Sequence, residues 1–329
     1  MIRRVTVPPH RPLSAPSRTG RFFGSALRFS RSGLLALGLA SAPLAGHAEA
    51  SAPLPSVIDE ASGLARSSVH EGIFWTHNDN IALPASSGSG PPILYALKSD
   101  GQLAGQVTLT GANKRDWEAI ARARWQARPV LLVGDIGDNL ETHEYYRILI
   151  VEEPSEFQPA MTIPLLGEIR FRYPDRAQDT EAMVYDRSAD RLLLLTKRRK
   201  RPMLYQLPLE PTGDRVIEAQ PVAQLEGFSP RDPITWLANP LIGPFAHQPT
   251  GMDIRPDGLQ MAVLTYSTVY LFDREPDQTW GEALEARPGV ASLPRLDQWE
   301  GIAYTADGKS LMVVHEGKRG ALHTLDLSR

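Results

Sequence analysis

Short apolar runs recur along the chain and are separated by turn-forming residues, a pattern typical of a protein built from many short β-strands. Clear examples of such runs are "PVLLVGD" (129–135), "YYRILIVEE" (145–153), "RLLLLTK" (191–197) and "MLYQLPL" (203–209). Turn signals such as "DRSADR" (186–191) and "RPDG" (255–258) lie between predicted strands. The pattern therefore predicts an all-β fold.

One short motif recurs along the chain and defines a repeat. A polar residue is followed by a small and then an apolar residue in "EASGLA" (60–65), "DWEAIA" (116–121), "DTEAMV" (179–184), "QPTGMD" (248–253) and "QWEGIA" (298–303). The polar positions, called the key positions below, are Ser62, Glu118, Glu181, Thr250 and Glu300, and neighbouring ones are 50 to 69 residues apart. A period of this length is typical of a four-stranded propeller blade.

The last repeat has three predicted strands, and one further strand is predicted ahead of the first motif. The segment "LPSVID" (54–59) would complete the last repeat by pairing beside "ALHTLDL" (321–327), which closes the ring and removes its edges. The sequence therefore predicts one domain over residues 51–329, a five-bladed β-propeller whose N-terminal strand closes the last blade. The alternative is a six-bladed ring, with an extra blade where "SPRDPITWLANPLIGPFAHQ" (229–248) is expected to form a loop.

Residues 1–50 have the features of a signal or targeting segment. Arginine is frequent, no acidic residue precedes Glu49, and the apolar stretch 32–46 leads to small residues suited to cleavage after Ala48 or Ala50. The apolar stretch is too short for a spanning helix. We expect a periplasmic or secreted monomer with no stable membrane span; a disordered tail or a membrane anchor is the alternative.

Composition narrows the chemistry. The formal net charge of −3 gives no reason to expect a nucleic-acid partner. The chain contains no cysteine, which excludes disulfides, thiolate catalysis, iron–sulfur clusters and a lipid-modified cysteine. The 26 glycines and 28 prolines favour short strands and turns over long helices.

In a propeller, the innermost strand of each blade begins on the face where the second strand ends. Glu118, Glu181 and Glu300 are then expected to crowd the mouth of the central channel. Further oxygen donors expected near this mouth are Asp116, Asp135, Asp138 and Asn139. Like charges this close raise pKa values or require a cation, and hard oxygen donors favour Ca²⁺, with Mg²⁺ or no metal as alternatives. The structural alternative is that each carboxylate accepts hydrogen bonds from a neighbouring blade.

The basic segment "KRRKR" (197–201) follows the second strand of the third repeat. It is either a solvated loop or the source of Lys197, which would reach the mouth and bind an anionic group. If the Lys197 ammonium reaches the glutamates, an ion-pair network would satisfy them without a metal. The candidate catalytic residues are His315, Asp116 and Lys197, with His315 or an unligated carboxylate as the general base.

The motifs "DWEAIA" (116–121) and "GDIGDN" (134–139), with the strands that follow them, resemble a group of exported bacterial β-propeller proteins over most of residues 60–329. More distantly, the chain is similar to esterase-like and phytase-like propellers and to calcium-dependent lactonases. This resemblance implies Ca²⁺ held by Glu118, Glu181, Glu300, Asn139 and Asp135. Those families commonly have six blades, so their substrates do not transfer.

Three function classes follow from the predicted mouth. A metal-dependent hydrolase would act on a phosphoester or lactone, with a cation polarising the substrate oxygen and activating water. A non-catalytic propeller would bind a small anionic molecule or a protein partner on the same face. A glycosidase would use two of the carboxyl groups as acid and base.

Overall fold

The computed structural model describes residues 48–79, 90–158, 161–198, 201–226, 228, 245–294, 298–317 and 320–328. All of them belong to one compact unit, Ser41–Arg329, and they form strands, turns and the one-turn helix α2 (Trp280–Ala283). No helix in this described part is long and apolar enough to cross a membrane. The predicted signal segment lies outside the described residues, except for its last three residues, and so does most of the predicted loop 229–248.

The described strands form antiparallel four-stranded meanders, which we number along the chain. Meander 1 consists of β2 (Ala61–Arg66), β3 (Ile73–Asn78), β4 (Ile93–Lys98) and β5 (Leu103–Thr110). Meander 2 consists of β6 (Trp117–Trp125), β7 (Arg128–Asp135), β8 (Tyr146–Glu152) and β9 (Met161–Arg172). Meander 3 consists of β10 (Thr180–Asp186), β11 (Arg191–Thr196), β12 (Met203–Pro208) and β14 (Gln220–Gln224).

The remaining meanders differ in how they obtain their fourth strand. Meander 4 consists of β15 (Pro249–Ile254), β16 (Gln260–Thr265), β17 (Thr268–Asp273) and β18 (Gly289–Ser292). Meander 5 consists of β19 (Trp299–Tyr304), β20 (Ser310–His315), β21 (Ala321–Asp326) and the N-terminal strand β1 (Ala48–Pro53). The fourth strand of meander 5 thus comes from the opposite end of the chain.

Parallel pairing at the outer edges links two of the meanders. The long strand β9 pairs in parallel with β5, which joins meanders 1 and 2 into one continuous sheet. The short strand β13 (Val216–Glu218) also pairs in parallel with β9. These pairings cover strand edges that would otherwise be free to pair with another chain.

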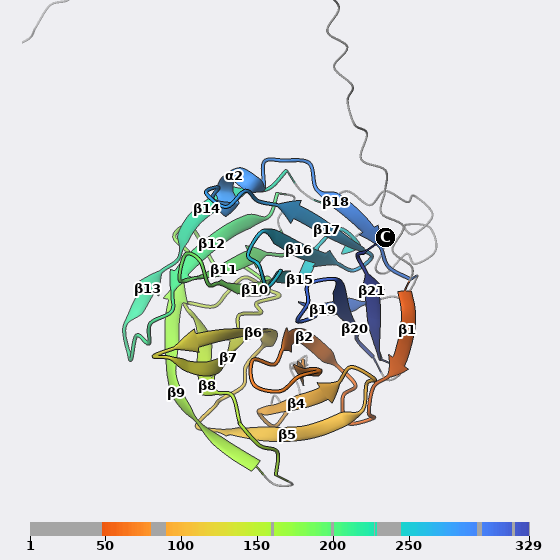
Figure 1. Ribbon diagram of the computed structural model, residues 1–329. Helices are drawn as coiled ribbons and strands as arrows, with labels where there is room; N and C mark the ends of the chain where they lie inside the picture. Colours follow the sequence, from red (N-terminus) through yellow and green to blue (C-terminus); the bar gives the residue numbers. More distant parts are fainter. Residues whose placement is uncertain are drawn as a thin grey trace, which may run out of the picture. The chain divides into compact units, whose positions relative to one another are not determined.

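The first strand of every meander lies nearest the centre in Figure 1, and these inner strands contact one another in a cycle. The cycle runs from β2 to β6, β10, β15 and β19, and β19 contacts β2 again. The fold is therefore all-β and propeller-like, as the sequence predicts. The inner strands are those that carry the repeated motif.

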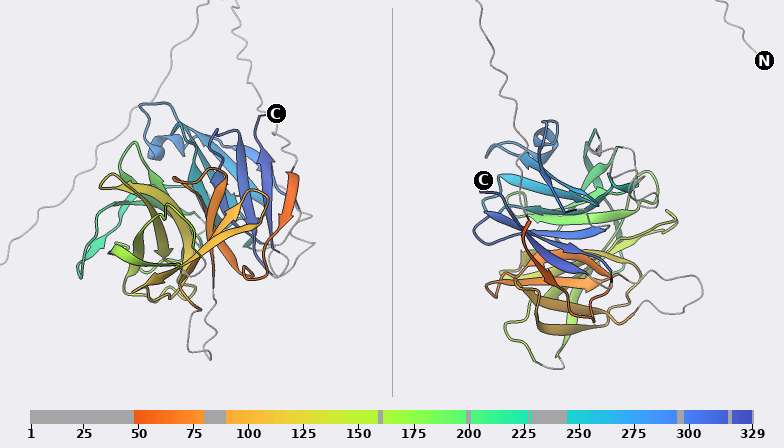
Figure 2. Two further views of the ribbon diagram at one scale, coloured as in Figure 1. Left: turned by 60° about the horizontal axis from the view of Figure 1, so that its bottom comes forward. Right: turned by 90° about the vertical axis from the view of Figure 1, so that its right-hand side faces the viewer.

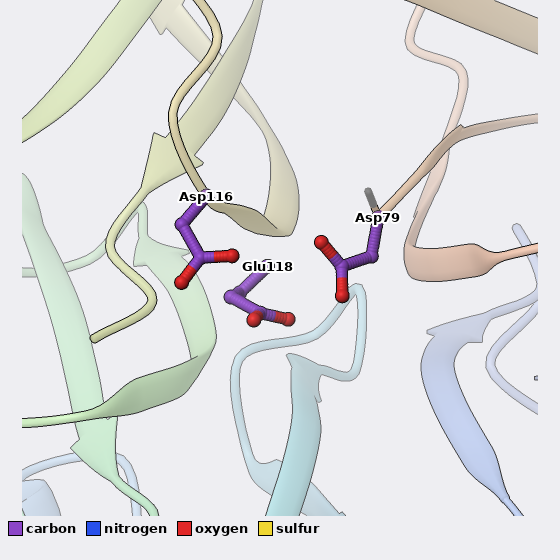
Figure 3. Close-up of side chains that lie close together, drawn as sticks. All are labelled: Asp79, Asp116 and Glu118. Carbon is purple, nitrogen blue, oxygen red and sulfur yellow. The ribbon is translucent and has the colours of Figure 1, made fainter. Parts of the chain in front are cut away.

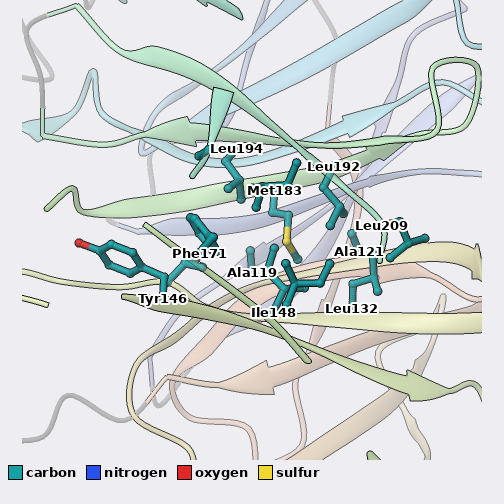
Figure 4. Close-up of a cluster of buried hydrophobic side chains, with 14 of the residues drawn as sticks. Ala119, Ala121, Leu132, Tyr146, Ile148, Phe171, Met183, Leu192, Leu194 and Leu209 are labelled. Atoms are coloured by element: carbon teal, nitrogen blue, oxygen red, sulfur yellow. The ribbon is translucent and has the colours of Figure 1, made fainter. Parts of the chain in front are cut away.

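Hydrophobic side chains fill the space between neighbouring meanders. Figure 4 shows such a layer between meanders 2 and 3, where Ile148 and Phe171 pack with Met183 and Leu194. Corresponding clusters lie between meanders 1 and 2, 3 and 4, 4 and 5, and 5 and 1. The second strand of each sheet is buried on both faces and is therefore almost continuously apolar, as in β7 and β11, whereas outer strands such as β9 and β14 are more exposed.

The predicted N-terminal strand is wrong in position, although its pairing partner is right. The strand that pairs with β21 is Ala48–Pro53, in an antiparallel register from Ala48 opposite Leu325 to Pro53 opposite Ala321. Residues 54–59 form a turn instead, in which the Ile58 N–H donates to the Pro55 carbonyl at 2.9 Å. Pro55 lacks an N–H group for a ladder, so the strand ends before it. Figure 2 shows β1 beside β21 at the outer edge.

The expected cleavage sites after Ala48 or Ala50 fall inside β1.

Removing β1 is expected to destabilise the whole unit. A chain that starts at Leu54 loses the ladder to β21 and the 3.2 Å contact between Ser51 Oγ and His323 Nε2. At roughly 1 kcal/mol for each net hydrogen bond, the expected loss is about 3–5 kcal/mol in the free energy of unfolding. Urea unfolding of this chain, compared with one that starts at Ala48, measures the loss; equal midpoints would contradict the prediction.

Candidate functional site

A β-bulge presents the key residue in four of the inner strands. In β6, Trp117 lies opposite Asp135 and Ala119 lies opposite Gly134, so Glu118 has no partner across the ladder. The same register shift occurs in β10, β15 and β19, so the key residues Glu181, Thr250 and Glu300 also have no partner across the ladder. In β2 the irregularity lies between Ser62 and Ala65. A bulge bends the strand and re-aims the extra side chain, which here brings the key residues to one end of the inner strands.

Small residues directly after the key positions allow the inner strands to pack closely against one another. Gly63 has φ +67°, and a Cβ built on it would lie 2.8 Å from the backbone N of Ile120. A Cβ on Gly301 would lie 2.6 Å from the carbonyl carbon of Gly63. The cavity left among the inner strands at this level, which we call the waist, is only about 10 Å³. That is room for one water molecule at most, so the central channel is blocked.

Above the waist lies a cavity of about 220 Å³, called the mouth, which collects acidic side chains from several meanders. The carboxyl groups that line it belong to Asp79, Glu118, Glu181, Glu300 and Glu316. The cations that line it are Lys197 and Arg198. Arg198 is directed to other partners, since its guanidinium contacts Asp179 at 2.5 Å and also binds Asn139. The mouth therefore holds more carboxyl groups than cations.

Three carboxyl groups at one side of the mouth converge closely. Asp79, Asp116 and Glu118 each contribute an oxygen, and these oxygens lie within 4.8 Å of one another (Figure 3). Asp79 follows β3 of meander 1, whereas the other two precede and begin β6. The Ser62 hydroxyl donates to Glu118 Oε2 at 3.3 Å. Hard oxygen atoms at this spacing are a donor set suited to Ca²⁺ or Mg²⁺.

The loop after β7 packs directly on these carboxyl groups. A Cβ built on Gly137 would lie 2.4 Å from Asp116 Oδ2 and 2.8 Å from Glu118 Cγ. Only glycine leaves space for both side chains there, which explains the second glycine of the "GDIGDN" segment. The Gly137 N–H also donates to the Asp116 carbonyl at 3.2 Å, which holds the loop against the strand.

Lys197 neutralises one of the glutamates. Its ammonium donates to Glu181 Oε1, and its Nζ lies 5.1 Å from the centre of the Tyr266 ring. Burial lowers the pKa of Lys197, but Glu181 and the neighbouring carboxyl groups outweigh this effect and hold that pKa well above its ordinary value. Glu181 Oε2 is buried and has no hydrogen-bond partner among the described residues. Among the described residues, the ion pair of Lys197 that the sequence left open is formed with Glu181.

Burial and mutual repulsion raise the pKa values of the mouth carboxyl groups. Burial, followed by the charge of Glu181, raises the pKa of Asp79 to about 6. Burial and Asp79 raise the pKa of Asp116 to about 7. The pKa values of Glu118 and Glu300 lie well above the ordinary range for the same reasons. For Glu316, burial and the adjacent Glu60 raise the pKa to about 8. In the absence of a cation, several of these groups are protonated near neutral pH.

Asp135 and Asp138 have structural roles away from the mouth cavity. The Asp135 carboxylate accepts hydrogen bonds from the Asp116 N–H at 2.7 Å and from Arg147 Nε at 2.9 Å. Asp138 accepts from the His143 N–H at 2.8 Å and from the Tyr146 hydroxyl at 2.9 Å. Protein donors thus occupy both carboxylates, whereas Asn139 does line the mouth. The proposed ligand roles of Asp135 and Asp138 do not fit this arrangement.

The side chains of His315 and Thr250 do not line the mouth either. The His315 ring lies edge-on to Trp299, with ring centres 5.7 Å apart, and His315 does not line the mouth. The Thr250 hydroxyl donates to the Trp299 carbonyl at 2.6 Å. The mouth is instead lined by Glu316, the residue directly after His315, which the sequence analysis did not single out. Gln298 Nε2 donates to Glu316 Oε2 at 2.6 Å.

Comparisons with known proteins add a likeness of fold. No protein-family model matches the sequence, and no curated protein matches it. The structure is similar to that of Myxococcus xanthus glutaminyl cyclase, with 12% identity and a TM-score of 0.48 over 86% of this chain and 97% of that chain. It is also similar to a chain of a nidogen/laminin complex, with 14% identity and a TM-score of 0.41 over 78% of this chain and 73% of that chain. Neither likeness carries information about chemistry.

Replacing Gly137 with alanine is expected to disturb the mouth. The added methyl group would overlap the Asp116 carboxyl group and the Glu118 Cγ atom, so the loop or these side chains must shift, at a cost of about 1–3 kcal/mol. Gly289→Ala is the matched control, because its Cβ would meet no atom closer than 3.6 Å. Urea unfolding of both variants provides the measurement. Equal stability of the two variants would show that the loop does not press on the carboxyl groups.

The stability of the metal-free protein is expected to fall as the pH rises. The raised pKa values, about 6 for Asp79, 7 for Asp116 and 8 for Glu316, mean that the folded state binds protons more tightly than the unfolded chain. Stability from these groups is fully present below their unfolded pKa values and is lost as the pH rises through the folded ones. Melting temperatures in EDTA should therefore be lower at about pH 8 than at about pH 6.5. The opposite trend would contradict the assignment.

Proposed function

We propose that this chain is an exported, five-bladed β-propeller that binds a divalent cation at its mouth and hydrolyses a phosphoester or lactone there. The observation that carries the proposal is the convergence of buried carboxyl groups around one cavity, where they outnumber the neighbouring cations Lys114, Lys197 and Arg198. The cyclic contacts of the inner strands and the pairing of β1 with β21 support five blades in a closed ring. Export rests on the arginine-rich, apolar N-terminal sequence.

The donor set fits a hard cation. Asp79, Asp116 and Glu118 offer only oxygen atoms, and the Glu118 side chain is almost completely buried. Asp79 Oδ1 is buried without a hydrogen-bond partner among the described residues. These residues would hold Ca²⁺, with Mg²⁺ as the alternative. A cation there would polarise a substrate oxygen and lower the pKa of a bound water.

Two further carboxyl groups of the mouth offer an acid and a base. Glu181 lies beside the Lys197 ammonium, and burial, partly offset by Lys197, raises its pKa to about 7, which suits a general base. Burial and the charge of Glu181 raise the pKa of Glu300 well above its ordinary value, which suits a proton donor. Glu181 would accept a proton from the attacking water, and Glu300 would protonate the leaving oxygen as its bond to phosphorus or to the acyl carbon breaks.

The size of the mouth limits what it can receive. Its volume of about 220 Å³ is below the range of roughly 300–1,000 Å³ that is typical of small-molecule pockets. We therefore expect only the reacting end of a substrate to enter, with the rest lying outside. The same observation favours a second candidate function, in which the mouth holds a cation and a small ligand without catalysis.

The cation is tested first. EDTA should lower the melting temperature and added Ca²⁺ should restore it, since a ligand that binds only the folded state stabilises it by mass action. Asp116→Asn should abolish this response, whereas Asp307→Asn, an exposed turn residue that accepts from the Thr305 hydroxyl, should keep it. If EDTA has no effect while Lys197→Ala costs about 3–5 kcal/mol, an ion-pair network without metal replaces the proposed site.

Catalysis is tested with chromogenic phosphodiesters and simple lactones on the Ca²⁺-loaded full chain. Glu300→Gln should lower kcat by about 10²–10⁴-fold without changing Ca²⁺ binding, because it removes only the proton donor. Gln replaces Glu at nearly constant volume, so the fold is expected to persist. Calcium binding without turnover on any of these substrates would favour the non-catalytic binding protein.

A further inference from the structure

The other end of the inner strands carries a second cavity, of about 330 Å³, which we call the arginine pocket. Its arginines come from the ends of inner strands and the turns that follow them, and they are Arg66, Arg122, Arg124, Arg187 and Arg255. The volume falls within the range typical of small-molecule sites. The waist separates this pocket from the mouth, so the two cavities are independent binding spaces.

The two acidic residues of the arginine pocket offset only part of its positive charge. Asp186 forms an ion pair of 3.1 Å with Arg274, which is not part of the pocket lining. Asp253 uses its carboxylate to accept the N–H groups of Ile254 and Tyr304, both at 2.8 Å. The Asp253 carboxylate also lies close enough to Arg66 and Arg122 to offset part of their charge. Outside the lining, Asp257 pairs with Arg255 at 2.9 Å. A substantial positive charge remains in the pocket.

The deepest arginines are the least satisfied. Arg66 and Arg122 are both partly buried, and the Nε atom of each is buried without a hydrogen-bond partner among the described residues. Burial, and then the neighbouring charge of Arg122, lower the pKa of Arg66. Two guanidinium groups held together in a recess repel each other, and their unused N–H donors require an acceptor.

We propose that the arginine pocket binds a small molecule that carries two or more oxyanion charges, as carboxylate or phosphate groups. Guanidinium groups present paired N–H donors in a fork that matches both kinds of oxyanion. The pocket is recessed between turns of meanders 3 and 4 and the strand ends of meanders 1 and 2, which admits a small ligand. The proposal does not depend on the function proposed for the mouth.

Calorimetric titration of the full chain with inorganic phosphate and with succinate tests the proposal. At least one of them should bind at micromolar to millimolar concentration, more weakly in high salt, and the preferred anion identifies the chemistry as phosphate or carboxylate. Arg122→Gln and Arg66→Gln should each weaken binding about 10- to 100-fold, the loss expected for a charge-assisted hydrogen bond. Arg172→Gln is the matched control, because Arg172 is exposed on β9 and pairs with Glu218 at 3.5 Å.

Stability separates a binding role from a structural one. The loss of repulsion from Arg66 favours free Arg122→Gln, whereas the loss of the charge that faces the buried Asp253 disfavours it, so its melting temperature should change little. A lower melting temperature with unchanged anion affinity would make Arg122 a structural residue and overturn the proposal. It is also overturned if neither anion binds at millimolar concentration, or if Arg172→Gln weakens binding as much as Arg122→Gln does.

Discussion

The close approach of the inner strands around the centre is the constraint on which the rest of the structure depends. Gly63 and Gly301 leave no space for a side chain where β2 meets its neighbours. Because these strands meet so closely at the waist, the residues just above it are forced together. The acidic mouth is therefore a consequence of backbone packing, and its carboxyl groups are crowded whether or not a cation accompanies them.

The two ends of the inner strands differ in charge. Carboxyl groups gather at the strand beginnings, and guanidinium groups gather at the ends of the same strands. β6 shows this on one element, since Glu118 lines the mouth and Arg122 lines the arginine pocket. A formal net charge of only −3 conceals this separation, because the opposite charges lie in different places and cancel only in the total.

The repeated motif predicts the inner strands well, because the close packing of these strands requires a small residue after each key position. The position of β1 could not be predicted, because its sequence "AEASAP" has few large apolar residues whereas the neighbouring "LPSVID" has several. An outermost strand needs little apolar character. It also could not show that Arg147 reaches Asp135 from the neighbouring strand β8 and occupies its carboxylate. Arg147 lies directly opposite Asp135 in the β7–β8 ladder, and such pairings depend on a cross-strand register that the sequence alone does not fix.

The bulges at the key positions have a consequence for how the mouth can vary. A residue outside the ladder register has no cross-strand neighbour that its side chain must match. Glutamate and threonine both occupy this position in different meanders, and the backbone pairing on either side is the same. The identity of the bulged residue is therefore uncoupled from the pairing that builds the scaffold. A ring of this kind can exchange its central functional groups one at a time while the sheets around them keep their register.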